Sequence, residues 1–168
     1  MSRPAPAGFS LFELVLYIAL TAVLLTVTSA LLGVLLQARI KQRSIAEIDQ
    51  QGLQVIQLMS SSVQAADSVL EPLPGASTTG LSLVPADAAP GPIVFQVISG
   101  VLMMSVAGGE PVPLHNSRVT VANLNVENLG EPGIMDSLHF SFTVSHENEG
   151  GRNEYDYART FYGAVNRR

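Results

Sequence analysis

Residues 8–36 read GFSLFELVLYIALTAVLLTVTSALLGVLL, and beyond Glu13 this stretch contains no charged residue. A helix of about 20 apolar residues crosses the hydrocarbon core of a bilayer. The sequence therefore predicts a membrane-spanning helix over residues 14–36. Glu13 is unexpected at the edge of this run, because a carboxylate in the middle of a bilayer costs about 2.5–3.5 kcal/mol and marks a candidate functional residue.

Two simpler interpretations of the apolar run remain open. A secretory signal peptide has a basic start, an apolar core of about 7–15 residues and a small-residue cleavage site behind that core. Here the run is longer, residues 1–8 contain only Arg3 as a basic residue, and Ser29 and Ala30 lie inside the run. An ordinary single-pass anchor fits the length but gives no reason for Glu13.

The order of residues around Glu13 favours a third interpretation. Gly8-Phe9-Ser10-Leu11-Phe12-Glu13 resembles the prepilin-type N-terminal cleavage and methylation motif of the type IV pilin-like family, which includes the type II secretion pseudopilins. The resemblance covers residues 8 to about 38. It implies that a prepilin peptidase removes residues 1–8 as a leader peptide by cutting between Gly8 and Phe9. It also implies that Phe9 is N-methylated and that Glu13, the fifth mature residue, directs assembly.

The chemistry of these residues agrees with that interpretation. Glycine has no side chain, so the backbone at Gly8 is easily extended for a protease. Phe9 and Glu13 are spaced to share one face of a helix. The resemblance implies that the Glu13 carboxylate pairs with the Phe9 amine of a neighbouring subunit. Since an unpaired charge in low dielectric is heavily penalised, such a pair fixes register more than it adds stability.

The resemblance also implies a location and an orientation. The chain would cross the bacterial inner membrane once, with a cytoplasmic N-terminus and the head outside the cytoplasm, and would later enter a pilus or pseudopilus. The basic residues Arg39, Lys41 and Arg43 flank the far end of the span, and a positive-inside count would place that end in the cytoplasm. We give the motif precedence, because the peptidase requires the leader on its own side of the membrane.

Beyond the membrane span the sequence turns amphipathic. Apolar residues recur at steps of three or four from Ile45 to Leu70, which predicts a helix with one buried face over residues 37–70. No proline interrupts residues 9–70, so we expect one helix whose first half, residues 9–36, lies in the membrane. Gly33 and Gly52 are its weak points.

Residues 71–168 are predicted to form an antiparallel β head domain. The segment 71–92 is rich in proline and glycine and reads as a loop with one strand at 81–84. Alternating patterns predict further strands, with a hairpin turn at Ser99-Gly100 and a bulge near Ala122-Asn123. These strands cover residues 93–98, 101–106, 118–126, 138–144 and 155–165. The expected fold is α+β, a long N-terminal helix packed on a small antiparallel sheet.

The head offers little for catalysis or nucleic-acid binding. The net charge is −5. Between residues 71 and 156 the acidic residues far outnumber the basic ones, which are only Arg118 and Arg152. Such an acidic segment repels the phosphate backbone of a nucleic acid, which argues against a nucleic-acid partner. The chain has no cysteine. The histidines His115, His139 and His146 lack metal-ligand spacing. The oxygen-rich segment 147–154 would suit calcium, but a solvated turn fits it better. We therefore predict no enzymatic activity, no catalytic residue and no cofactor.

The functional hypothesis is a structural subunit of a type IV pilus or a type II secretion pseudopilus. The lack of a cysteine-closed C-terminal loop and a loose likeness of the head favour a minor subunit of the J or W type. Its expected partners are other pilin or pseudopilin subunits, the prepilin peptidase, the inner-membrane assembly platform and membrane lipid. The alternative is a single-pass membrane-anchored extracytoplasmic binding domain or enzyme.

Overall fold

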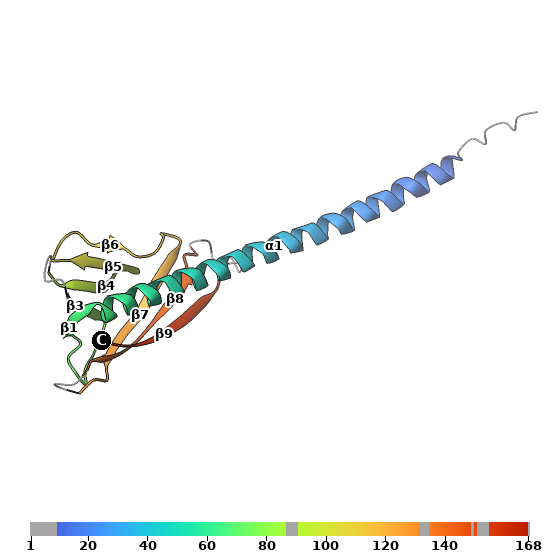
Figure 1. Cartoon of the computed structure of the whole chain (residues 1–168). Helices are drawn as coiled ribbons and strands as arrows, with labels where there is room; N and C mark the ends of the chain where they lie inside the picture. The colour runs from blue at the N-terminus through green and yellow to red at the C-terminus, as the bar shows by residue number, and fades with distance from the viewer. Residues whose placement is uncertain (1–9, 87–90, 132–134, 149, 151–154, 168) are drawn as a thin grey trace, which may run out of the picture. The chain divides into compact units, whose positions relative to one another are not determined.

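The computed structural model describes residues 10–86, 91–131, 135–148, 150 and 155–167 (Figure 1). The chain divides into two compact units, Met1–Ile40 and Lys41–Arg168, which we describe separately. Its elements are α1 (Leu11–Gln64), β1 (Ala66–Glu71), β2 (Ser77–Thr78), β3 (Gly80–Pro85), β4 (Ile93–Ile98), β5 (Val101–Val106), β6 (Val112–Pro113), β7 (Val119–Asn128), β8 (Ser137–His146) and β9 (Ala158–Asn166).

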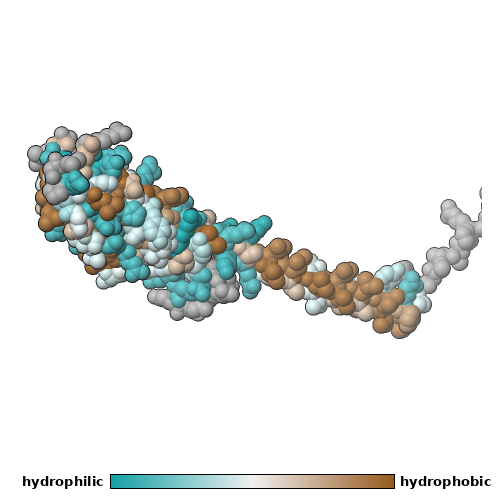
Figure 2. All heavy atoms as spheres, turned by 90° about the horizontal axis from the view of Figure 1, so that it is seen from below, coloured by the Kyte–Doolittle hydropathy of each residue, from teal (hydrophilic) through white to brown (hydrophobic). Residues whose placement is uncertain are grey.

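The first unit consists of the apolar part of α1. Its side chains are exposed almost throughout, and Figure 2 shows them as a largely hydrophobic surface. An 18-residue window of α1 has a mean hydropathy of 2.3, so this helix is long and apolar enough to cross a membrane. The hydroxyls of Thr21, Thr26 and Thr28 each donate to the carbonyl four residues earlier, at 2.6–2.8 Å. These polar groups are therefore satisfied within the helix, as an apolar environment requires.

The helix is shorter at its C-terminal end than the sequence predicted. We expected it to continue to Leu70, and this is wrong: α1 ends at Gln64, and residues 66–71 form β1. Pro72 disfavours the helical conformation in the residue before it, and β1 gains a hydrogen-bonded partner in β3. The helical spacing of apolar residues extended past Gln64 because Ala66 continues it. Ala66 is indeed buried, but as part of strand β1.

The second unit contains two antiparallel sheets where the sequence predicted one small sheet. The strand order is β1-β3-β4-β5-β6 in the first sheet and β2-β7-β8-β9 in the second. The α+β class is confirmed, but the described strands are more numerous than expected. The unpredicted strands β1, β2 and β6 are short or irregular. Each forms by hydrogen bonding to a longer neighbouring strand: β1 to β3, β2 to β7 and β6 to β5.

Two local predictions are confirmed. The strands β4 and β5 form a hairpin in which Ser99 and Gly100 have φ of 50° and 79°. Positive φ at both turn residues is the pattern that matches strand twist in a two-residue loop. The bulge appears as a register shift in β7 between Ala122 and Asn125, with Asn123 at φ 55°.

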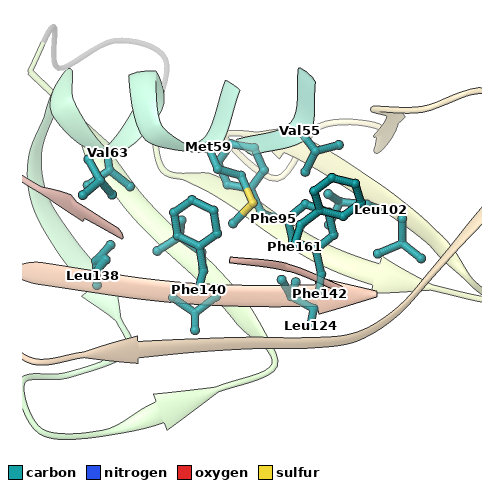
Figure 3. Packing of buried hydrophobic residues seen from close by; sticks show 14 of the residues in the cluster. Val55, Met59, Val63, Phe95, Leu102, Leu124, Leu138, Phe140, Phe142 and Phe161 are labelled. Carbon is teal, nitrogen blue, oxygen red and sulfur yellow. The ribbon is translucent and has the colours of Figure 1, made fainter. Parts of the chain in front are cut away.

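The core lies between the last part of α1 and both sheets (Figure 3). On β8, partly exposed and buried residues alternate from Ser137 to Val144, which orients one face towards the helix. In this unit α1 buries a stripe spaced by three or four residues, consisting of Ser44, Ile48, Gly52, Val55, Met59 and Val63. It faces Phe95, Phe140, Phe142 and Phe161, among others. Each large apolar side chain buried here contributes about 1.5–3 kcal/mol.

Candidate functional site

The candidate cleavage site, Gly8 and Phe9, lies outside the described residues, whereas Glu13 lies within them. Ser10 immediately precedes α1. Its carbonyl oxygen accepts from the backbone N–H groups of Glu13 (3.1 Å) and Leu14 (3.2 Å), and its Oγ accepts from the Glu13 N–H (3.2 Å). Ser10 is therefore the N-cap of α1, and Ser10-x-x-Glu13 has the spacing of a capping box.

The Glu13 carboxylate is partly exposed in the first turn of α1, where the helix dipole favours a negative charge. Around it, Leu11, Phe12 and Leu14 are exposed apolar side chains. Within the described ranges, no side chain pairs with this carboxylate. The cap uses the backbone N–H of Glu13, so the capping contact itself does not engage the carboxylate. This cap was not among the predicted features, although the Ser-x-x-Glu spacing is a sequence signal for it.

In the head, Glu47 is the centre of a polar cluster. Its Oε1 accepts a hydrogen bond from the Asn116 amide at 2.7 Å, and its Oε2 lies 3.9 Å from Nε2 of His146. The other ring nitrogen of His146, Nδ1, lies 2.9 Å from the Glu147 carbonyl oxygen, to which it donates. The cluster places the 115–118 turn and the end of β8 against α1.

His115 has a structural role. It is buried, its Nε2 accepts the backbone N–H of Leu102 at 3.0 Å, and its Nδ1 lies 2.9 Å from the Asn116 carbonyl oxygen. A backbone N–H only donates and a carbonyl only accepts, so the ring is neutral with its proton on Nδ1. Nε2 of His115 thus accepts the Leu102 N–H of β5, as the carbonyl of a neighbouring strand would. Because both ring nitrogens are engaged with the backbone, His115 is unsuited to proton transfer.

A second polar cluster, around the buried Asn128, joins distant parts of the head. The Asn128 amide donates to the Pro72 carbonyl oxygen and to Oδ1 of Asp136, each at 3.0 Å. Arg167 Nε donates to Oδ2 of Asp136 at 3.0 Å, and its guanidinium also donates to the Asp67 carbonyl oxygen. This network ties the end of β9 to β1 and to the segment before β8, so it supports the fold.

The described residues contain no metal centre: no group of three or more histidine, aspartate or glutamate side chains is placed to hold an ion. Much of the oxygen-rich segment considered for calcium lies outside the described residues. A hollow of about 560 Å³ opens near the bulge of β7, between Asn123 and the strands β3 and β4. Among the described residues that line it, Glu71 is the charged one, and no histidine, lysine or arginine is present.

Across the described ranges, the arrangement is therefore suited to membrane insertion and to contacts between proteins. An apolar helix begins at a capped turn that holds a free carboxylate, and the polar clusters of the head are engaged in internal hydrogen bonds. In comparisons with known proteins, no protein-family model, no curated protein and no solved structure matches this chain.

Proposed function

We propose that the chain is a structural subunit of a type IV pilin-like filament, cut by a prepilin peptidase and assembled through its N-terminal helix. The observation that carries this proposal is the Glu13 carboxylate. It lies in the first turn of an apolar helix and has no partner within the described part of the chain. An unpaired carboxylate at this position would cost free energy in a bilayer and serve no purpose. As one half of an ion pair between subunits, it would fix the position of a neighbouring helix.

The amine that cleavage would create at Phe9 is the matching cation. This amine is close in sequence to Glu13 of the same chain. We infer that Glu13 pairs instead with the Phe9 amine of a neighbouring subunit, because only a pair between subunits would make assembly depend on Glu13. The lack of cysteine agrees with a minor subunit of the J or W type. The proposed location is the bacterial inner membrane, with the head outside the cytoplasm, followed by a pilus or pseudopilus. The proposal assigns the chain no catalytic activity.

Processing is the first test. Intact mass and N-terminal sequencing of the membrane-extracted protein should show that residues 1–8 are absent, that Phe9 is the first residue, and that one methyl group has been added. The matched control is the same chain produced without a prepilin peptidase, which should begin at Met1. A cut near Ala30 in both samples would identify a signal peptide and refute the proposal.

The role of Glu13 is the second test. Glu13→Val should keep membrane insertion and cleavage but should reduce cross-linking to the partner pilin-like subunits at equal membrane levels. Ser10→Ala is the matched control: it removes the N-cap, which costs about 1 kcal/mol of helix stability, but it leaves the carboxylate in place. Equal loss of cross-linking in both variants would mean that any disturbance of the first turn of α1 impairs assembly, and it would refute a specific role for the Glu13 carboxylate.

An anchored binding domain or enzyme is separated from a filament subunit by exchanging the anchor. Residues 1–36 are replaced with an unrelated single-pass helix, and incorporation beside partner subunits is measured. A filament subunit should fail to incorporate, because its register contact is lost. A head that keeps its full biological function on the foreign anchor would show that the original helix serves only to attach it.

A further inference from the structure

Three basic residues follow the apolar part of α1, and we refer to them as the basic trio. Arg39, Lys41 and Arg43 occupy alternate positions of the helix, and all three are exposed. They are the charged residues between Glu13 and Glu47, so no acidic residue lies among them. The end of the apolar run therefore carries three positive charges and no negative charge.

The nearest carboxylates that follow the basic trio in α1 are engaged with the head. Glu47 has the helical spacing to pair with Arg43, but its Oε1 accepts a hydrogen bond from the Asn116 amide at 2.7 Å. Asp49 accepts a hydrogen bond from Arg159, also at 2.7 Å. Among the described residues, no ion pair includes a member of the basic trio. Its three cations are therefore available to a partner outside this chain.

Helix geometry places the basic trio at the level of the lipid headgroups. With residues 14–36 in the hydrocarbon core, a rise of about 1.5 Å per residue puts Arg39 about 4–5 Å beyond the core, and Arg43 about 10 Å beyond it. The headgroup layer on each side of a bilayer is about 5–8 Å thick. Arg39 and Lys41 therefore lie in this layer, and the long side chain of Arg43 reaches back into it.

This position favours phospholipid over an acidic protein as the partner of the basic trio. Lipid phosphates surround a membrane-spanning helix at the headgroup level. A protein carboxylate would first have to enter that layer and lose part of its hydration, which costs free energy. The acidic segment between residues 71 and 156 is repelled by the same phosphates, so the attraction is confined to the trio.

We propose that the basic trio binds the phosphate groups of anionic phospholipids in the leaflet on the head side of the membrane. A guanidinium donates two parallel hydrogen bonds to a phosphate, and the Lys41 ammonium binds it as a point charge. An anionic lipid such as phosphatidylglycerol is preferred to zwitterionic phosphatidylcholine, whose own ammonium offsets its phosphate. This contact fixes the depth of α1 in the bilayer. The inference rests on the membrane span and not on the proposed filament function, since an anchored domain would carry the same residues.

Lipid selectivity of the full-length chain tests this proposal. The chain is reconstituted in phosphatidylcholine vesicles with a trace of spin-labelled phosphatidylglycerol or spin-labelled phosphatidylcholine, and electron spin resonance measures how much label the protein immobilises. The wild type should prefer phosphatidylglycerol by about fivefold, which is what one basic residue near the surface contributes to lipid association. The triple variant Arg39→Gln, Lys41→Gln, Arg43→Gln should show no preference. Raising the salt from about 0.1 M to about 1 M should also abolish it, because the screening length falls from about 10 Å to about 3 Å.

The matched control is Arg118→Gln, which removes an exposed arginine of the head that belongs to no ion pair among the described residues. It should leave the lipid preference unchanged. A preference that survives the triple variant, or that Arg118→Gln lowers equally, would overturn the proposal. So would a wild type that immobilises neither lipid, since α1 would then not span the bilayer. A wild type without lipid preference, whose triple variant loses cross-linking to partner subunits, would assign the basic trio to a protein contact instead.

Discussion

At the scale of single residues, α1 contains two glycines in opposite situations. A Cβ on Gly33 would meet nothing within 4 Å, whereas a Cβ on Gly52 would lie 2.2–2.6 Å from ring atoms of Phe161. We therefore expect Gly52→Ala to lower the free energy of unfolding of the head by about 1–3 kcal/mol, the usual cost of overpacking. Gly33→Ala should cause no loss, because alanine favours a helix by up to about 1 kcal/mol. Thermal and chemical denaturation of the full-length variants measures the difference.

The clash with Phe161 can itself be tested. Phe161→Leu shortens the side chain that faces Gly52, so the double variant with Gly52→Ala should be less destabilised than the sum of the two single variants. Strict additivity would show that Gly52 matters for a reason other than contact with this ring. The sequence marked Gly52 as a weak point of the helix, whereas the structure places it directly against the ring of Phe161, with no room for a Cβ.

At the scale of elements, the end of β9 is held by buried polar contacts. Asp136 accepts from both Arg167 and Asn128, and its side chain is largely buried. Asp136→Ala should cost about 1.5–3 kcal/mol, because the Arg167 guanidinium and the buried Asn128 amide each lose one of their two acceptors. The matched control is Asp49→Ala, whose partner Arg159 is exposed, and this variant should melt like the wild type. Equal melting of both variants would contradict a structural role for the Asp136 network.

Elements with local signals were predictable from the sequence. The turn at Ser99-Gly100 supplied the β4–β5 hairpin, and the clean alternation of β8 gave both its position and its buried face. Strands β1, β2 and β6 carry little pattern of their own and depend on partners elsewhere in the chain, so sequence periodicity could not place them. The same holds for side-chain contacts: the Ser10-x-x-Glu13 cap can be read from nearby residues, whereas Asp136 and Arg167 meet only through the register of β8 and β9.

At the scale of the whole molecule, the division into two units predicts that the head is independent of the membrane segment. Residues 41–168 include the α1 stripe from Ser44 to Val63 and both sheets, which together form one buried cluster. A protein of these residues should be soluble and should unfold in a single cooperative transition, followed by circular dichroism. A fragment of this size buries enough surface to fold alone.

The matched control removes the helix as well. Residues 66–168 keep every described strand but lose Ile48, Val55, Met59 and Val63, each of which is at most 1% exposed in the complete head. Without these side chains, the apolar faces of both sheets would lie open to water, and each lost aliphatic side chain forfeits about 1.5–3 kcal/mol. Since a domain is stable by only about 5–15 kcal/mol, this shorter fragment should show no cooperative melt. If it folds as well as residues 41–168, the sheets stabilise each other and the helix only covers them. In that case a change such as Gly52→Ala should hardly affect the stability of the head.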